Sequence, residues 1–389
     1  RTKTSGGLTI NTSLVTLTGG RILENLAGST ATMTASVTFP FNNPASIENA
    51  GLWEIQNDAD FTDGGGAGTR SITNSGTFRN PAGAGTSSCG SPFNNTGTVE
   101  VLAGTLQYTR GYTQTAGSTT LNGGTLASST TLDVQGGNFT GVGTASANLT
   151  SAGHVAPGLS IATLSLTGNY TQTSAGDLNI ELGGLTPGTQ YDRFAVSGIA
   201  TLAGTLNVTF VNGFVPVDGN SFTILTFASS TGAFTTLNLP TLDGGAYWLT
   251  NYGPTSLTLT VALDSDGDGA PDINDCAPQD PGAFASPAEV KGDRFGSDKR
   301  TYSWTSLAPS SGSATVHDVM RGALNEFPVG GGGAETCLAS GIVASSITDA
   351  TVPAASSGFY YLARGRNVCG TGSYGSATDG AQRTTSACP

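Results

Sequence analysis

Five aspartates follow one another at short intervals between residues 264 and 275. In the run DSDGDGAPDINDC they take the first, third, fifth, ninth and twelfth positions, and Gly269 takes the sixth. Alternate side chains of such a loop can point at one cation, the glycine permits a tight bend, and the seventh residue can offer its carbonyl oxygen. Because calcium prefers oxygen ligands, the segment predicts a structural calcium site formed by Asp264, Asp266, Asp268, Ala270, Asp272 and Asp275.

This spacing is that of an EF-hand calcium loop, except that Asp275 stands where the twelfth residue is usually glutamate. Because Cys276 follows at once, the segment resembles a thrombospondin type 3 calcium repeat. The resemblance implies a structural ion that would stiffen the connection between the parts of the chain on either side. The alternative is a solvated acidic linker without an ion, in which the carboxylates would repel one another.

A second acidic group lies in the first hundred residues and contains Glu54, Asp58, Asp60 and Asp63. A carboxylate pair at a suitable separation can hydrolyse a glycosidic bond, and Arg70 and Arg79 could neutralise an acidic sugar. An exposed acidic turn explains the group more simply, and we favour that interpretation. The sequence has no Gly-x-Ser-x-Gly or His-Glu-x-x-His motif, and His154 and His317 fall in different predicted domains. We therefore expect no enzymatic activity.

Three tryptophans could instead stack on sugar rings without any catalysis, and they are Trp53, Trp248 and Trp304. They are widely scattered along the chain, and scattered tryptophans more often belong to a hydrophobic core. Sugar binding therefore stays an alternative to a purely structural role.

The five cysteines are unevenly distributed: Cys89 stands alone, and Cys276, Cys337, Cys369 and Cys388 fall in the last third of the chain. Without any Cys-x-x-Cys spacing, these four indicate disulfides more than a zinc site. Four cysteines allow three pairings, and the residues themselves leave all three open. Disulfides indicate an oxidising compartment and therefore export. We expect the odd thiol, Cys89, to be exposed and to form an intermolecular bridge.

The composition narrows the class of protein. The net charge is −12 and charged residues make up only 11% of the chain, with no cluster of Lys or Arg, so nucleic-acid binding is not expected. No apolar run approaches the roughly 20 residues of a membrane-spanning helix, so we expect no direct membrane insertion. Short β-branched runs closed by Gly and Asn dominate, which predicts an all-β fold.

Internal repetition organises the first half of the chain. Residues 47–53, 72–78 and 93–99 share the form apolar-x-Asn-x-Gly-x-apolar, and the copies begin 25 and then 21 residues apart. Such short units must stack as coils about 4.8 Å apart to bury a common core. We expect Gly and Asn to form the corners, because they tolerate left-handed backbone angles. Turns every 8–12 residues or so would indicate an antiparallel sandwich, so the longer offsets favour a parallel solenoid.

These repeats, together with the Tyr-Thr-Gln-Thr units at 112–115 and 170–173, Tyr191-Asp192 and the run 222–227, resemble large repetitive surface proteins of Gram-negative bacteria. The similarity extends to the passenger regions of autotransporter-like adhesins and covers about residues 45–262. It implies a right-handed parallel β-helix with an adhesive or structural role and brings no catalytic motif.

The C-terminal residues 287–389 lack the repeats and carry strand-like runs at sandwich spacing. A tryptophan on the second expected strand, a glycine-rich loop after the third and a tyrosine-rich run near residue 360 resemble a fibronectin type III module. In that fold the sixth strand ends near the incoming linker, and the seventh ends near the turn after the third strand. The resemblance therefore implies the disulfides Cys276–Cys369 and Cys337–Cys388.

We predict an all-β protein whose parts are β-solenoid repeats (1–177), a closing β-region of the solenoid (178–263), an acidic calcium-binding linker (264–286) and a fibronectin III/Ig-like β-sandwich (287–389). Its expected role is that of a secreted, non-catalytic structural or adhesive protein of the bacterial cell surface or matrix, able to form filaments. Expected partners are further copies of itself in a homopolymer or fibre, or other surface proteins and glycans. The alternative is a polysaccharide-binding or polysaccharide-degrading β-helix protein.

Overall fold

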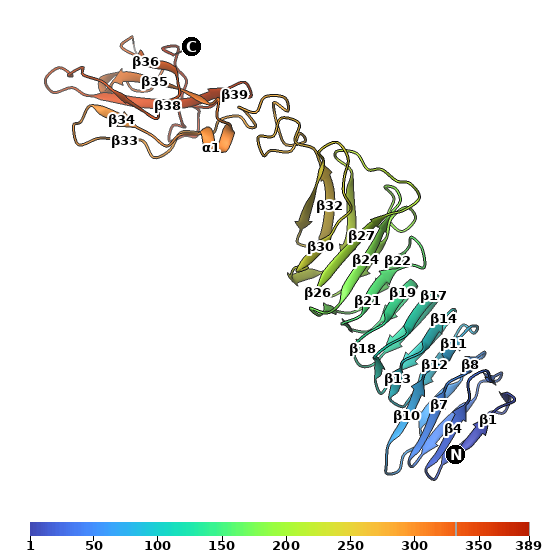
Figure 1. Ribbon diagram of the computed structural model, residues 1–389. Helices are drawn as coiled ribbons and strands as arrows, with labels where there is room; N and C mark the ends of the chain where they lie inside the picture. Colours follow the sequence, from blue (N-terminus) through green and yellow to red (C-terminus); the bar gives the residue numbers. More distant parts are fainter. Residues whose placement is uncertain (331–332, 389) are drawn as a thin grey trace. The chain divides into compact units, whose positions relative to one another are not determined.

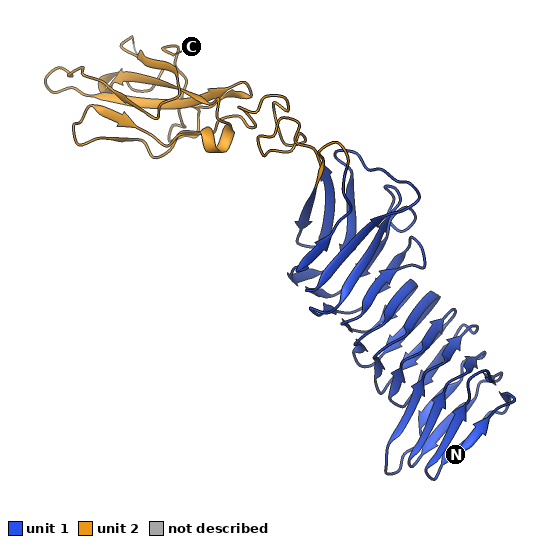
Figure 2. Ribbon diagram, in the orientation of Figure 1, with its two compact units in different colours: residues 1–242, 248–261 blue, residues 243–247, 262–389 orange. Residues whose placement is uncertain are grey.

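The structure, a computed structural model, describes residues 1–330 and 333–388, so residues 331–332 and 389 of the predicted C-terminal domain lie outside the described residues. The chain divides into two compact units, which Figure 2 colours separately. Unit 1 comprises residues 1–242 and 248–261, and unit 2 comprises residues 243–247 and 262–389. Within the described residues, no helix combines the length and apolar character needed to cross a membrane.

Unit 1 is a parallel β-solenoid, which confirms the predicted fold class (Figure 1). The chain winds through three faces, and strands of successive coils pair in parallel on each of them. The first face is an 11-stranded sheet. Its strands are β1 (Thr2–Thr4), β4 (Arg21–Asn25), β7 (Ala45–Asn49), β10 (Arg70–Asn74), β13 (Phe93–Asn95), β16 (Tyr112–Gln114), β18 (Leu132–Val134), β20 (Leu149–Ser151), β23 (Tyr170–Gln172), β26 (Ile199–Leu202) and β29 (Ser229–Gly232).

The second and third faces belong to one continuous sheet, because the long strands β17 and β19 run through the corner between them. The second face contains β2 (Leu8–Ile10), β5 (Thr30–Met33), β8 (Leu52–Ile55), β11 (Thr77–Asn80), β14 (Thr98–Val101), β17 (Ser118–Ser128), β19 (Asn138–Ser146), β21 (His154–Pro157), β24 (Asp177–Leu182), β27 (Thr205–Phe210) and β30 (Thr236–Asn238). Besides β17 and β19, the third face contains β3 (Leu17–Thr18), β6 (Thr38–Asn42), β9 (Asp60–Asp63), β12 (Thr86–Cys89), β15 (Thr105–Tyr108), β22 (Thr163–Leu166), β25 (Arg193–Val196) and β28 (Ser221–Thr226).

The parallel stacking continues through the segment predicted to close the solenoid. It ends on the third face, where β32 (Ser256–Ala262) pairs antiparallel with β28. Nearby, β31 (Tyr247–Tyr252) carries Trp248, whose ring packs against Phe210 and Phe222. The antiparallel strand β32 pairs with β28, the last parallel strand of this face, and so leaves no exposed edge on β28.

The repeat seen in the sequence sets the register of the coils. Ile47 pairs with Ile72 and Ile72 with Phe93, so equivalent repeat positions lie directly above one another. Along most strands buried and partly exposed residues alternate, which directs one set of side chains into a common core. Aromatic rings continue through that core from coil to coil in the order Phe39, Phe61, Phe78, Phe93 and Tyr112.

The repeated asparagines serve a different purpose from the one predicted. Asn49, Asn74 and Asn95 are buried at the ends of first-face strands, and none is among the residues with left-handed backbone angles. Their side-chain amides instead bond to one another along the solenoid axis, with Nδ2–Oδ1 distances of 2.7 Å from Asn49 to Asn74 and 2.8 Å from Asn74 to Asn95. The complete ladder runs through Thr4, Asn25, Asn49, Asn74, Asn95 and Gln114.

The ladder should contribute measurably to stability. Asn74 accepts from Asn49 and donates to Asn95 and to the Thr98 carbonyl, so Asn74→Ala leaves buried polar groups without a partner. We expect a loss of about 2 kcal/mol in the free energy of unfolding of unit 1, measured by denaturant titration. The matched control is Asn94→Ala on an exposed position of β13, which should change stability by less than about 0.5 kcal/mol. Equal effects of the two variants would show that the ladder adds nothing.

The repeated glycines are also explained by packing. Gly51, Gly76 and Gly97 are not left-handed, and a Cβ on each would lie 2.1–2.2 Å from a carbonyl oxygen of the preceding coil. Glycine stands there because only a hydrogen atom fits between the stacked backbones. Thus the predicted coils are correct. The left-handed angles expected at their corners are absent from these three glycines and three asparagines, but they are present at the equivalent corner of later coils, at Gly117 and Gly137.

Unit 2 contains separate antiparallel sheets, as predicted for the C-terminus. One sheet has the order β33 (Arg294–Phe295), β34 (Thr301–Ser303), β37 (Ser346–Thr348). The other has the order β36 (Thr336–Ile342), β35 (Val316–Ala323), β38 (Phe359–Asn367), β39 (Gly370–Thr371). Two short helical turns, α1 (Ala308–Ser311) and η1 (Leu324–Glu326), flank β35. Tyr302 and Trp304 pack against Val319 and Ala363, which joins the two sheets through one core.

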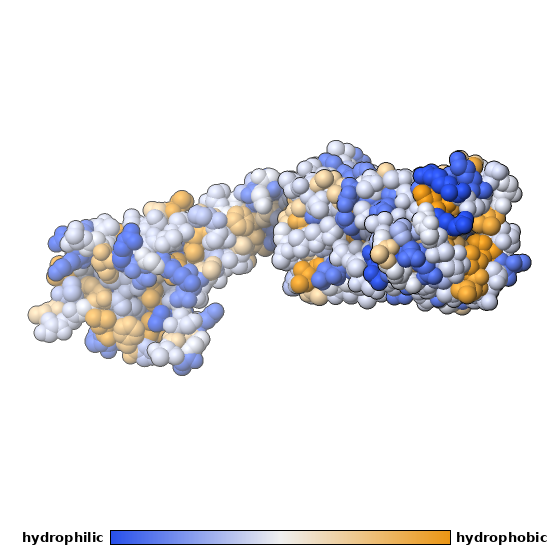
Figure 3. All heavy atoms as spheres, turned by 90° about the horizontal axis from the view of Figure 1, so that it is seen from below, coloured by the Kyte–Doolittle hydropathy of each residue, from blue (hydrophilic) through white to orange (hydrophobic). Residues whose placement is uncertain are grey.

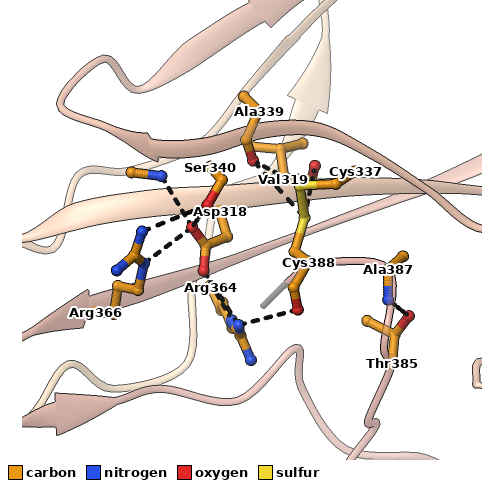
Figure 4. A network of polar contacts seen from close by, with 11 residues as sticks. Asp318, Val319, Cys337, Ala339, Ser340, Arg364, Arg366, Thr385, Ala387 and Cys388 are labelled. Carbon is orange, nitrogen blue, oxygen red and sulfur yellow. Dashed lines mark hydrogen bonds and ion pairs between the residues drawn. A yellow bond between two sulfur atoms is a disulfide. The ribbon is translucent and has the colours of Figure 1, made fainter.

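A buried charge network fixes the larger sheet of unit 2 (Figure 4). Asp318 on β35 is fully buried and forms ion pairs with Arg364 at 3.2 Å and Arg366 at 3.1 Å, both on β38. Ser340 and the Gly341 backbone amide, from β36, also donate to this carboxylate. Burial alone would raise the pKa of Asp318, but these donors together hold it below its usual range. The network therefore ties three strands to one anion.

The cysteines pair as the fibronectin resemblance implied. Cys276 is bonded to Cys369 and Cys337 to Cys388, both within unit 2. Cys89 is free but lies fully buried on β12, and burial raises the pKa of its thiol. The predicted exposed thiol and intermolecular bridge are therefore wrong, because this sulfur faces the solenoid core.

Candidate metal centre

The acidic loop 264–275 follows β32 and is shaped by its own carboxylates. Asp264 accepts hydrogen bonds from the backbone amides of Gly267 at 2.7 Å and Gly269 at 3.0 Å. Both glycines have left-handed backbone angles, with φ of 77° and 96°. The bend assigned to Gly269 from the sequence is therefore present, and it folds the chain around the Asp264 side chain.

Three more carboxylates each have one oxygen that accepts a hydrogen bond and one oxygen that does not. Asp266 Oδ1 accepts from the Asp268 amide, Asp268 Oδ1 from the Ala270 amide, and Asp275 Oδ1 from the Ala277 amide. Their Oδ2 atoms are shielded from solvent and have no hydrogen-bond partner among the described residues. A buried anionic oxygen without a partner is costly, so this arrangement is suited to a cation.

Three carboxylates of the loop are close enough to share one ion, and Asp275 is not among them. Asp264, Asp266 and Asp268 each offer an oxygen that lies within 4.8 Å of the others. Burial raises the pKa of Asp266, and the negative charges of Asp268, Asp275 and Asp264 raise it further against one lowering backbone hydrogen bond. A divalent cation would remove this repulsion, and hard oxygen ligands at such a bend fit calcium.

Two of the predicted calcium ligands, Asp272 and Ala270, form contacts that differ from those of the other aspartates. Asp272 turns toward Ser265 and accepts from its amide at 2.7 Å and its hydroxyl at 2.6 Å. Its own amide donates to the Leu263 carbonyl, so Asp272 closes the base of the loop. Ala270 bonds to Asp268 through its amide, and its role as a carbonyl ligand stays a prediction.

The loop belongs to unit 2 and is bonded to the end of its larger sheet. The disulfide Cys276–Cys369 begins one residue after Asp275 and joins the loop to the turn between β38 and β39. The Ser286 hydroxyl donates to the Cys369 carbonyl at 2.7 Å, and the Asn367 side chain donates to the Ala285 carbonyl at 2.9 Å. A cation in the loop would thus be bound next to a covalent attachment to the sandwich.

The carboxylates of the second acidic group form ion pairs or hydrogen bonds within unit 1. Glu54 pairs with Arg79, and Asp63 pairs with Arg70. Asp60 accepts from the Ser88 amide at 2.9 Å, and Asp58 accepts from the Gly85 amide at 3.2 Å, so each bonds to a neighbouring coil.

The aromatic candidates for sugar stacking are also largely withdrawn from solvent. Trp53 is fully buried and Trp304 is 5% exposed, so neither can stack on a sugar, which corrects that part of the carbohydrate hypothesis. The Trp248 indole donates to the Pro240 carbonyl within the closing region.

The acidic loop is therefore the site best prepared for a ligand among the residues singled out from the sequence. It offers anionic oxygens that are held in place by hydrogen bonds from the loop's own backbone. Compared with known protein families and with curated proteins, the chain matches none. The chemistry of this loop consequently rests on its own geometry.

Proposed function

We propose that the chain is a secreted, non-catalytic structural or adhesive protein of the bacterial cell surface or matrix. The solenoid acts as a stalk, unit 2 acts as an adhesive module, and calcium in the acidic loop stiffens the joint between them. The observation that carries this proposal is the set of unpaired carboxylate oxygens on Asp266, Asp268 and Asp275 at the start of unit 2.

The stalk role is supported by the construction of unit 1. A shared aromatic core and an asparagine ladder join every early coil to the next, so the unit resists bending without needing a ligand. On the face shown in Figure 3, neutral and hydrophilic atoms cover most of this unit, and hydrophobic atoms form separate patches. Such a surface suits a solvated spacer better than a membrane-bound one.

Export and the module type are supported by unit 2. Its two disulfides would persist in an oxidising compartment. The strand orders β33-β34-β37 and β36-β35-β38-β39 support the resemblance to a fibronectin type III module. Such a module offers exposed sheet edges, and the partners we propose for it are surface proteins, glycans or further copies of the chain.

The joint is tested by measuring the distance between labels at the exposed residues Thr201 in unit 1 and Thr351 in unit 2 by single-molecule energy transfer. We expect calcium to narrow the distance distribution relative to chelator. Asp268→Asn should abolish the narrowing, because it removes one of the unpaired anionic oxygens. The exposed Asp293→Asn variant should respond as the wild type does. If the distance distribution of the wild type were the same with calcium and with chelator, the proposed joint would be contradicted.

A further inference from the structure

A small polar pocket lies at the corner between the third and first faces of unit 1. It has a volume of about 300 Å³ and is lined by Asp63, Thr69, Arg70, Ser91, Pro92 and Arg110. Its residues come from three successive corners, which follow β9, β12 and β15. Two arginines meet in this pocket although the whole chain has only 15 basic residues and a net charge of −12.

One arginine is fixed and the other retains free donors. Arg70 Nε bonds to Asp63 Oδ1 at 2.9 Å, and its Nη1 donates to the carbonyls of Gly65 and Gly66. Arg110 Nη2 bonds to Asp63 Oδ2 at 2.8 Å, and its side chain is 59% exposed. A guanidinium has five N–H donors, so this one ion pair leaves Arg110 able to bind an anion in the bidentate manner.

A buried hydroxyl completes the site. Ser91 is 1% exposed, lines the pocket, and its Oγ has no hydrogen-bond partner among the described residues. Unsatisfied hydroxyls are unusual in a folded interior, and a ligand oxygen beside Arg110 would provide the missing partner.

The net charge of the pocket indicates what charge a bound anion should carry. Two guanidinium groups and one carboxylate give the pocket a formal charge of +1, which suits a single carboxylate better than a doubly charged phosphate. The volume is at the lower limit for ligand pockets and suits a group the size of one sugar ring.

We propose that this pocket binds the carboxylate of a uronic acid residue in an acidic polysaccharide. Arg110 contacts the carboxylate, Ser91 donates to it, and Asp63 holds both arginines in position. The polysaccharide as the source of the carboxylate rests on the proposed extracellular location, whereas the anion site itself does not. No bond is made or broken in this binding.

The test is ligand-observed NMR of the whole chain with trigalacturonate in calcium-free buffer, beside maltotriose and acetate. We expect binding of trigalacturonate and not of maltotriose. Arg110→Gln should weaken that binding about tenfold, because it removes the charged donor. Ser91→Ala should weaken it several-fold. Arg21→Gln, an exposed position with the same change in charge, should bind as the wild type does.

Two results would overturn the proposal: no binding of trigalacturonate by the wild type, or equal binding by the Arg110 and Arg21 variants. Binding of acetate without binding of trigalacturonate would show that the pocket takes small anions and not an acidic polysaccharide, and would overturn the proposal as stated. Thermal melting of each variant confirms that it is folded. The joint is measured with calcium and the pocket without it, so failure of one experiment leaves the other result standing.

Discussion

Removal of the disulfide between Cys276 and Cys369, in a double serine variant, should destabilise unit 2 by about 4–5 kcal/mol. The bond joins residues separated by 93 positions, and closing a loop of about 100 residues restricts the unfolded chain by about 4.7 kcal/mol. The same bond fixes the end of the acidic loop, so the variant should also bind calcium more weakly.

Hydrogen exchange of the β38 amides measures this loss, because β38 is paired on both sides, with β35 and β39. The amides of β14 in unit 1 provide the internal control and should keep their protection. Unchanged exchange of β38 under non-reducing conditions would show that the disulfide does not stabilise the sandwich.

Gly76→Ala should destabilise unit 1 by about 3 kcal/mol or more. The added Cβ would lie 2.1 Å from the Gly51 carbonyl oxygen and 2.6 Å from the Ala50 carbonyl carbon. Both are backbone atoms of the preceding coil, so relief requires the coils to separate and weakens their shared hydrogen bonds. The ladder between Asn49 and Asn74 borders this contact and should be disturbed with it.

The matched control is Gly6→Ala, because a Cβ on Gly6 meets no atom within 4 Å and its backbone angle is not left-handed. This variant should unfold like the wild type in a denaturant titration. If Gly76→Ala were as stable as Gly6→Ala, the close stacking of the glycines would not limit the solenoid.

The repeat period predicted the stacked coils because it is visible along the chain. The function of its polar residues was not visible, since the partner of Asn74 is Asn95, and their proximity depends on the register between coils. A polar residue in a turn-rich sequence suggests a corner, whereas a polar residue repeated at one coil position can equally bond to its own copies. The position of Cys89 was also predicted wrongly: its thiol was expected to be exposed, but strand alternation directs the side chain inward.

The acidic loop was predicted in greater detail, because its carboxylates are close in sequence and the bend at Gly269 is local. Even there, Asp272 could not be separated from the other aspartates, since its bonds to Ser265 depend on how the loop closes. The pocket around Arg110 was missed entirely. Arg70 was noted beside the acidic group, but Arg110 and Ser91 reach it only through the stacking of later coils.

The most direct test of this account is a calorimetric titration of the folded chain with calcium. We expect one calcium ion to bind to the wild type and a higher melting temperature of unit 2 in its presence. Asp266→Asn should lose most of this affinity, and Asp293→Asn should retain it. No heat of binding and no shift in melting at millimolar calcium would contradict the account, because the unpaired oxygens of the loop would then have no cation to hold.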